Sequence, residues 1–76
     1  MSMPLSMVPE GSEVRIIGFR GGARFVQKLT AMGFVPGAVL KIIRSQSGGP
    51  MIVLIRGSQM AIGRGVASKI EVEQRV

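Results

Sequence analysis

Residues 28–37 read KLTAMGFVPG, a stretch that holds the end of a helix, a glycine and a Pro-Gly turn. Gly33 follows the last apolar position of the helical pattern, and glycine ends a helix there because it accepts a positive φ without Cβ strain. Pro36 and Gly37 suit the central positions of a type II turn, in which proline fixes φ and glycine takes the positive φ. The stretch predicts a helix that stops at Gly33 and a chain that turns straight into a strand.

The segment before this turn predicts one helix, over residues 23–32. Phe25, Leu29 and Met32 recur at helical spacing, and Val26 widens their apolar stripe. The remaining positions are mostly polar, which suits a side that faces solvent. We expect the stripe to pack on a sheet, because a short helix gains most of its stability from burying such a face.

Apolar runs bounded by glycine, proline and serine predict the strands. They cover residues 14–19, 39–44, 51–55, 60–62 and 69–73. In the last run Ile70 and Val72 alternate with glutamates and should point inward. Residues 1–10 are expected to form an extended lead-in, Gly57-Ser58 a tight hairpin turn, and residues 63–65 a bend.

Together these elements predict a mainly β chain, a small closed or nearly closed barrel of about five strands with one short helix inserted after the first strand. Seventy-six residues make a single domain, 1–76, with one thin core. The chain has no Cys and no His, so neither a disulfide nor a Cys/His zinc site can reinforce that core. The core must come from aliphatic, Met and Phe side chains.

The residue types absent from the chain also limit its chemistry. Asp is missing as well as Cys and His, so catalysis would fall to Glu, Lys or an unactivated Ser. No carboxylate pair sits next to a nucleophile in a glycine-framed loop. We therefore expect a binding module rather than an enzyme, with no catalytic residue and no cofactor.

The charge points to an acidic partner or to a solvated surface. Ten Lys and Arg residues against four Glu give a net charge of +6, and no run of five or more basic residues identifies the partner. An acidic protein face, a nucleic acid and an anionic membrane surface all remain open. The longest apolar run, residues 51–55, is too short for a bilayer and the N-terminus lacks a basic n-region, so we expect a cytoplasmic protein that reaches a membrane only through a partner.

The quoted stretch resembles the signature of the ferrous iron transport protein A (FeoA) family in Leu29, in Met32-Gly33-Phe34 and in Pro36-Gly37. Gly49-Pro50 before an apolar strand, and the stretch from Gly57 to Val72, agree with that family too. The resemblance implies an SH3-like barrel and an accessory role beside the membrane GTPase permease of bacterial ferrous iron uptake, ferrous iron transport protein B. Related domains form the C-terminal module of metal-dependent repressors of the diphtheria-toxin-repressor type, and this chain would be the stand-alone form.

The family name also suggests transition-metal binding. Ferrous iron is usually held by His nitrogens together with carboxylate oxygens, whereas this chain offers only Glu10, Glu13, Glu71 and Glu73. Glu71 and Glu73 point the same way from a strand, and we expect them to face solvent. The sequence therefore predicts no metal site, and a protein that acts on the transporter rather than on the ion.

Protein–protein binding remains, and the loop over residues 18–24, the exposed helix face and the turn over residues 33–37 form the expected rim. The residues predicted to bind the partner are Arg20, Arg24 and Lys28 by charge, and Phe34 or Val35 as an apolar anchor. The expected partner is the cytoplasmic region of the iron permease. The alternative is a basic nucleic-acid-binding β-barrel, although the chain has no Trp or Tyr for base stacking. Whether the protein activates or inhibits transport, and whether it forms a homo-oligomer, stays open.

Overall fold

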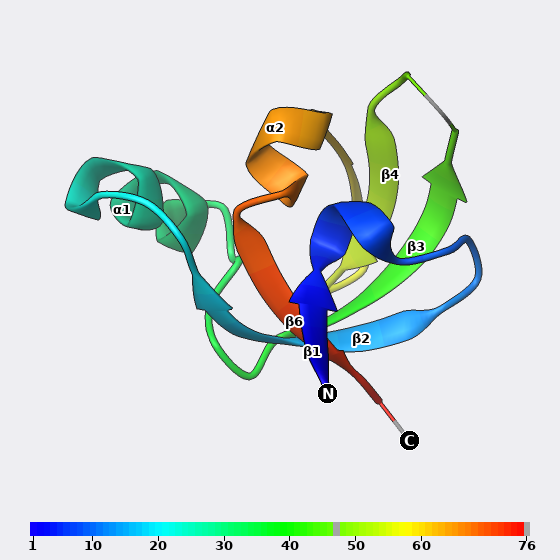
Figure 1. Cartoon of the computed structure of the whole chain (residues 1–76), viewed down its shortest axis with the longest axis horizontal. Coiled ribbons are helices and arrows are strands. Elements are labelled where there is room, and N and C mark those ends of the chain that lie inside the picture. The colour runs from blue at the N-terminus through cyan, green and yellow to red at the C-terminus, as the bar shows by residue number, and fades with distance from the viewer. Residues whose placement is uncertain (47, 76) are drawn as a thin grey trace.

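The computed structural model describes residues 1–46 and 48–75 of the chain. Within this part, six strands form one antiparallel sheet in the order β1-β6-β2-β3-β4-β5. The strands are β1 (Ser2–Pro4), β2 (Glu13–Phe19), β3 (Val39–Ser45), β4 (Met51–Ile55), β5 (Ser58–Ile62) and β6 (Ile70–Gln74). The helical elements are η1, a 3₁₀ turn (Leu5–Met7), α1 (Ala23–Ala31) and α2 (Arg64–Ala67). The predicted mainly β architecture is confirmed (Figure 1), but the sheet has six strands instead of about five, the inserted helix α1 follows the second strand, and the described residues hold a further short helix, α2.

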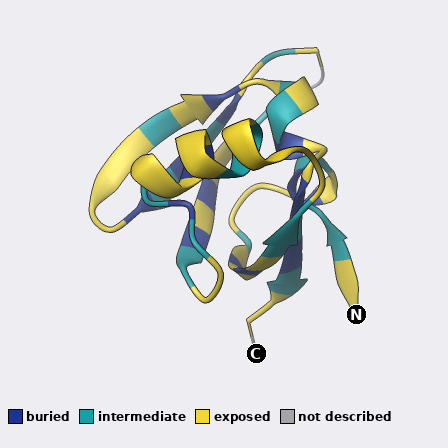
Figure 2. Cartoon of the chain, turned by 90° about the vertical axis from the view of Figure 1, so that its left-hand side faces the viewer, coloured by how far each residue is buried: buried dark blue, intermediate teal, exposed yellow. Residues whose placement is uncertain are grey.

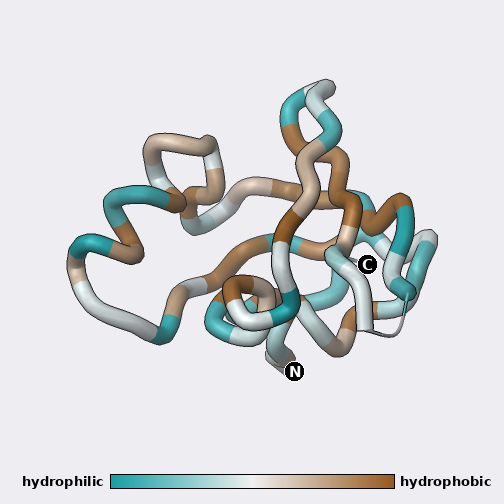
Figure 3. The backbone as a smooth tube through the Cα atoms, turned by 90° about the horizontal axis from the view of Figure 1, so that it is seen from above, coloured by the Kyte–Doolittle hydropathy of each residue, from teal (hydrophilic) through white to brown (hydrophobic). Residues whose placement is uncertain are grey.

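The sheet curls around one apolar core. Alternate strand residues point inward, and the predicted inward pair Ile70 and Val72 is fully buried. Figure 3 shows the hydrophobic segments gathered in the middle of the molecule, with hydrophilic segments toward the outer loops. Every residue of the core is apolar, and within the described residues no buried residue is polar or charged. The end strands β1 and β5 are not paired with each other in this part of the chain, so the sheet does not close.

The first residues are not the simple extended lead-in that the sequence predicts. Strand β1 pairs with β6, placing Met3 opposite Val72. The η1 turn then places Leu5 at 0% and Val8 at 1% exposure in the core. The correction has a physical reason, because the apolar residues of this segment complete a core that the remaining strands leave open at one end.

The turns follow local chemistry, with one shift of position. Gly33 and Gly37 both adopt φ of 92°, and the predicted type II turn is closed by the Ala38 N–H, which donates to the Val35 carbonyl at 3.0 Å. In the β4–β5 hairpin, however, the central residues are Arg56 (φ 51°) and Gly57 (φ 79°) instead of Gly57-Ser58. A primed turn requires positive φ at both positions, and this register lets Ser58 join β5.

Helix α1 differs most from expectation. Its apolar stripe was predicted to lie on a sheet, but of its residues only Leu29 is buried, and Met32, just after it, remains 40% exposed. Figure 2 shows most of the helix surface exposed. The bend predicted at residues 63–65 is the start of α2. No helix in the described ranges is both long and apolar enough to cross a membrane.

Candidate docking site

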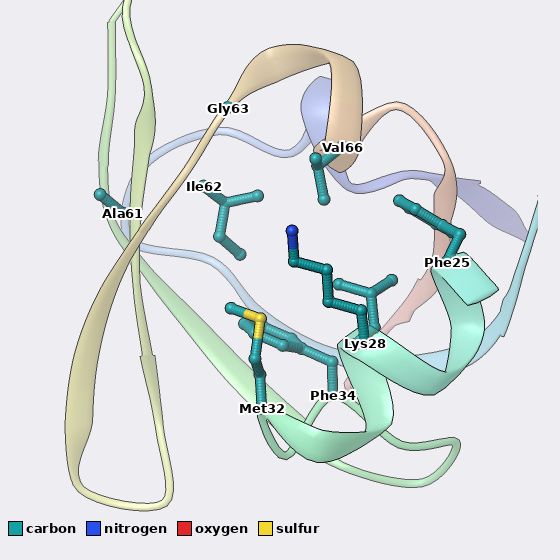
Figure 4. A pocket seen from close by; sticks show the side chains of 9 residues that line it. Phe25, Lys28, Met32, Phe34, Ala61, Ile62, Gly63 and Val66 are labelled. Atoms are coloured by element: carbon teal, nitrogen blue, oxygen red, sulfur yellow. The ribbon is translucent and has the colours of Figure 1, made fainter.

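An apolar cavity of about 220 Å³ separates α1 from the end of β5 and the start of α2 (Figure 4). Helix α1 and the residue after it supply one wall, with Phe25, Lys28, Leu29 and Met32. The opposite wall consists of Ala61, Ile62, Gly63 and Val66. Segments far apart in the sequence therefore form the two sides of one depression.

Helical spacing explains the first wall. Phe25, Lys28, Leu29 and Met32 stand at positions i, i+3, i+4 and i+7, so they share one face of α1. The stripe packs on the core through Leu29 and Phe25, and the same helix face also borders this cavity. A side chain such as Met32, apolar and partly exposed beside a depression, is available to contact another molecule.

Phe34 is not the surface anchor that the sequence predicts. After Gly33 the chain reverses, and the Phe34 N–H donates to the Leu29 carbonyl at 3.0 Å. Its ring is 0% exposed and lies under the cavity as part of its lining. Val35 is half-buried in the following turn and does not line the cavity. The accessible apolar contacts come from Phe25 and Met32.

The predicted basic residues are not equivalent in the structure. Lys28 lines the cavity, and Figure 4 shows its side chain directed toward the cavity. Arg24 is exposed one helical turn before it. The Lys69 ammonium lies 5.3 Å from the centroid of the Phe25 ring, a cation–π contact at the edge of the same site. No carboxylate is among the residues that line the cavity.

Arg20 does not line the cavity, and its charge is paired although its side chain is 72% exposed. Its Nε is 3.2 Å from Oε1 of Glu71 on β6. That oxygen is buried and accepts no hydrogen bond from the described residues, so the contact with Arg20 is an ion pair without hydrogen-bond geometry. Arg20 is therefore less available to a partner than Arg24 or Lys28.

All four carboxylates have partners within the described chain. Glu10 accepts a hydrogen bond from the Ser45 N–H at 2.8 Å. The ion pairs are Glu13–Arg75 at 3.1 Å, Glu71–Arg20 at 3.2 Å and Glu73–Arg15 at 3.7 Å. No group of three or more His, Cys, Asp or Glu residues that could hold a metal ion occurs in residues 1–46 and 48–75. The arrangement at the cavity is suited to binding and offers no acid–base pair.

Arg64 has a structural role that the sequence reasoning missed. Its guanidinium reaches four acceptors: Gly49 O (3.1 Å), Ser6 O (2.9 Å), Ser45 Oγ (3.0 Å) and Gln46 O (2.6 Å). It thereby ties the start of α2 to the N-terminal segment and to the β3–β4 loop. Since α2 carries Val66, these bonds also hold one wall of the cavity in place.

Sequence reasoning found one side of the site and not the other. The stripe of Phe25, Leu29 and Met32 was recognised, but as a core feature. Ala61 and Val66 gave no signal, because their proximity to α1 depends on how the whole sheet folds. A clue was available in the stripe itself, which continues to Met32, just after the last residue of a short helix.

Comparison with known proteins adds a family to this geometry. A family model described as the FeoA domain matches residues 3–74. A protein of Methanocaldococcus jannaschii named "Putative Fe(2+) transport protein A" is 46% identical over 70 residues, which cover 92% of this chain and 84% of that protein. A crystal structure of an "Iron Uptake Regulatory Protein (FeoA)" superposes with a TM-score of 0.92 at 35% identity, covering 99% of this chain and 100% of that one.

A "Manganese-dependent transcriptional repressor" contains a similar domain. It superposes with a TM-score of 0.87 over 97% of this chain and 42% of its own, at 14% identity. At that identity the likeness shows a shared fold and nothing more. With the iron uptake protein above, it confirms the predicted SH3-like fold.

Proposed function

Because the chain belongs to the FeoA domain family, we propose that it is a non-enzymatic accessory protein of ferrous iron uptake that works by binding another protein. The proposed partner is the cytoplasmic region of the membrane GTPase iron permease, which would hold this protein at the cytoplasmic face of the membrane. One observation supports the proposal most directly: a partly exposed apolar cavity is bordered by cations and lined by no carboxylate.

A binding role fits the residues better than catalysis or iron transfer does. The chain has no His or Cys, and each of its four carboxylates is engaged by a cation or a backbone N–H. An ion such as Fe²⁺ would have to displace those contacts, and it would find no group of three or more His, Cys, Asp or Glu ligands in residues 1–46 and 48–75. The iron is accordingly cargo of the transporter and not a ligand of this protein.

A protein partner also fits better than a nucleic acid. Base stacking needs exposed aromatic faces. Phe34 is fully buried, Phe19 and Phe25 are half-buried, and Lys69 lies over the Phe25 ring. The likeness to a transcriptional repressor concerns the fold alone. The net charge of +6 is then explained by attraction to an acidic protein surface.

The proposed docking face consists of the cavity together with Arg24, Lys28 and Lys69. Of the residues predicted from sequence, Arg24 and Lys28 remain in it. Phe25 and Met32 replace Phe34 as the apolar contacts, in keeping with the aromatic and Met side chains that enrich the centres of interfaces. Arg20 is left out because it does not line the cavity and forms an ion pair with Glu71.

The test is a titration of this protein with the soluble GTPase domain of the iron permease from the same organism, at about 150 mM salt. A matched pair of variants locates the site. Lys28→Glu reverses a charge at the cavity, whereas Lys41→Glu makes the same change on β3, away from it. We expect saturable binding, a loss of at least about tenfold for Lys28→Glu and little change for Lys41→Glu.

Other results would contradict the proposal in distinct ways. Equal weakening by both variants would show that only overall charge matters and would remove the cavity as the site. Binding to a mixed RNA and DNA control at the same salt, with none to the GTPase domain, would favour the nucleic-acid alternative.

A further inference from the structure

Strand β5 leaves one edge of the sheet open. It is the terminal strand in the order and pairs only with β4 within the described residues. Ile55 and Ser58 are paired across the two-residue turn. From Ser58 onward, every second residue of β5 directs its backbone N–H and C=O groups toward β4. Gln59 and Ala61 are the residues in between, so their N–H and C=O groups point away from the sheet. Neither makes a backbone hydrogen bond outside the ladder in this part of the chain.

This edge lacks the usual protection. Natural sheets blunt an exposed edge with prolines, charged side chains, bulges or very short strands. Strand β5 reads SQMAI, with no charge and no proline, and it pairs with β4 without a register shift. The other end of the sheet is blunted, since β1 has only three residues and ends at Pro4. An edge left regular at only one end is suited to accepting another strand.

The open edge leads into the cavity. Ala61 at the end of β5 lines the cavity, as do Ile62 and Gly63, and α1 forms the opposite wall (Figure 4). A segment paired alongside Ala61 would therefore lie between β5 and α1. Because side chains alternate along a strand, every second side chain of that segment would face the side of the apolar depression, and one of them would enter it.

We propose that this site binds an extended segment of an acidic partner, which adds as a strand to β5, seats one apolar side chain in the cavity and places a carboxylate beside Lys28. The proposal rests on the proposed function and specifies how the partner is held. Backbone pairing at Gln59 and Ala61 supplies affinity, and the cavity with its cations supplies selectivity, as in other cases of strand addition.

Charge decides which occupant the edge takes. Lys28 lines the cavity, Lys69 lies over the ring of the lining residue Phe25, and no carboxylate is among the lining residues. A second copy of this chain would bring the same cations and a β5 strand without any acidic residue, so two copies would repel each other at this edge. A segment with glutamate or aspartate on either side of an apolar residue matches the site.

The probe is the capped peptide TETLTET, whose two glutamates and leucine share one face of a strand. It is titrated into ¹⁵N-labelled protein, and amide hydrogen exchange is recorded residue by residue. We expect the amides of Gln59 and Ala61 to become at least about tenfold more protected, whereas the Met60 amide, which already faces β4, changes little. A peptide that docked through its side chains without strand pairing would not produce this alternation. If the alternating protection were absent, the proposal would be overturned.

Two sets of control peptides sharpen the result. In one version of the peptide the backbone nitrogens of the odd-numbered residues are methylated, and in a second version those of the even-numbered residues. Strand addition predicts that one methylation pattern abolishes binding while the other leaves it nearly intact, and equal effects of the two patterns would contradict it. The lysine version TKTLTKT should bind at least about tenfold more weakly, because its charges oppose Lys28. Equal binding of the two peptides would overturn the acidic occupant.

The remaining outcomes separate this inference from the proposed function. If the protein bound the GTPase domain but the amides of β5 showed no alternating protection from hydrogen exchange, strand addition alone would be refuted. If β5 bound the peptide and the protein did not bind the GTPase domain, the proposed partner alone would be refuted. Protection of Gln59 and Ala61 that rises with protein concentration in the absence of peptide would identify a second copy as the occupant and refute the acidic segment.

Discussion

Replacement of Arg64 by alanine tests how this small chain is held together. The guanidinium donates to Gly49 O, Ser6 O, Ser45 Oγ and Gln46 O, and these acceptors belong to two segments, the N-terminal η1 turn and the stretch from the end of β3 into the β3–β4 loop. Alanine removes every donor at once and leaves the partly buried acceptors to find water. We therefore expect Arg64→Ala to destabilise the whole fold rather than one loop.

The magnitude follows from those bonds. A hydrogen bond to a charged group contributes about 1.5–3 kcal/mol, but the acceptors share one donor group and the bond to Gln46 is solvent-exposed, so we expect a total loss of about 3 kcal/mol. At about 0.05–0.15 kcal/mol per residue, a chain of 76 residues has a free energy of unfolding of about 4–11 kcal/mol. The substitution would remove a large part of it and lower Tm by about 12–24 °C.

The assay is chemical denaturation followed by far-UV circular dichroism, because a chain without Trp or Tyr gives no useful fluorescence. Arg44→Ala is the matched control, since Arg44 is exposed on β3 and makes no ion pair or side-chain hydrogen bond within the described residues. It should change the free energy of unfolding by no more than about 0.5 kcal/mol. Arg64→Lys should lower the free energy of unfolding by at least half as much as Arg64→Ala does, because one ammonium group cannot reach all the acceptors that are arranged around the planar guanidinium.

The reasoning would be refuted by an Arg64→Ala protein whose midpoint and slope match those of Arg44→Ala. It would also fail if Arg64→Lys were as stable as the wild type, because charge alone would then explain the role of the residue. A lower slope at an unchanged midpoint would point to partial unfolding of the N-terminal segment instead of global destabilisation.

Three further predictions concern the core, the cavity and metal. Gly21→Ala should lower the free energy of unfolding by more than about 1 kcal/mol, because φ at Gly21 is 143° and the new Cβ would lie 2.9 Å from Cδ2 of Phe25. Gly65→Ala is the control, because open space surrounds Gly65 and the loss should stay smaller. Equal melting temperatures of the two variants would contradict this prediction. Phe34→Ala should cost about 3–5 kcal/mol in urea denaturation, and a loss below about 1 kcal/mol would show that Phe34 is not a core residue. Anaerobic addition of Fe²⁺ should leave Tm unchanged, since the carboxylates are paired, and a rise in Tm abolished by Glu71→Gln would reverse that conclusion.

Much of the fold could be predicted because its signals are local. The glycine stop at Gly33 and the turn at Pro36-Gly37 each depend on the φ that one residue permits, and both occur as expected. The five predicted strands follow from apolar runs bounded by glycine, proline and serine, a signal that tolerates small errors at strand ends. The hairpin turn shows the limit of such signals: Gly57 was placed correctly, but its register depends on pairing with β4.

The rest could not be predicted because it depends on contacts far apart in the sequence. Strand β1 is three residues long and exists only because Met3 lies opposite Val72. Arg64 appears in the sequence as a charge between two glycines, and its acceptor Ser6 is 58 residues away. Neither pattern has a periodicity or a composition that distinguishes it from a loop.

The misplaced helix stripe shows where a physical rule and a site come into conflict. Apolar residues at helical spacing predict burial. A chain of this size has a small core, so leaving such residues exposed gives up stabilisation that the chain needs. Helix α1 nevertheless buries only Leu29 and leaves Met32 40% exposed beside a cavity whose far wall is fixed by the bonds of Arg64. Leu29 of that stripe is buried and Phe25 packs against the core, so Met32 is the apolar position left exposed beside the cavity. The open edge of β5 lies along the same cavity, so one extended segment could both cover the exposed Met32 and satisfy the unpaired backbone groups.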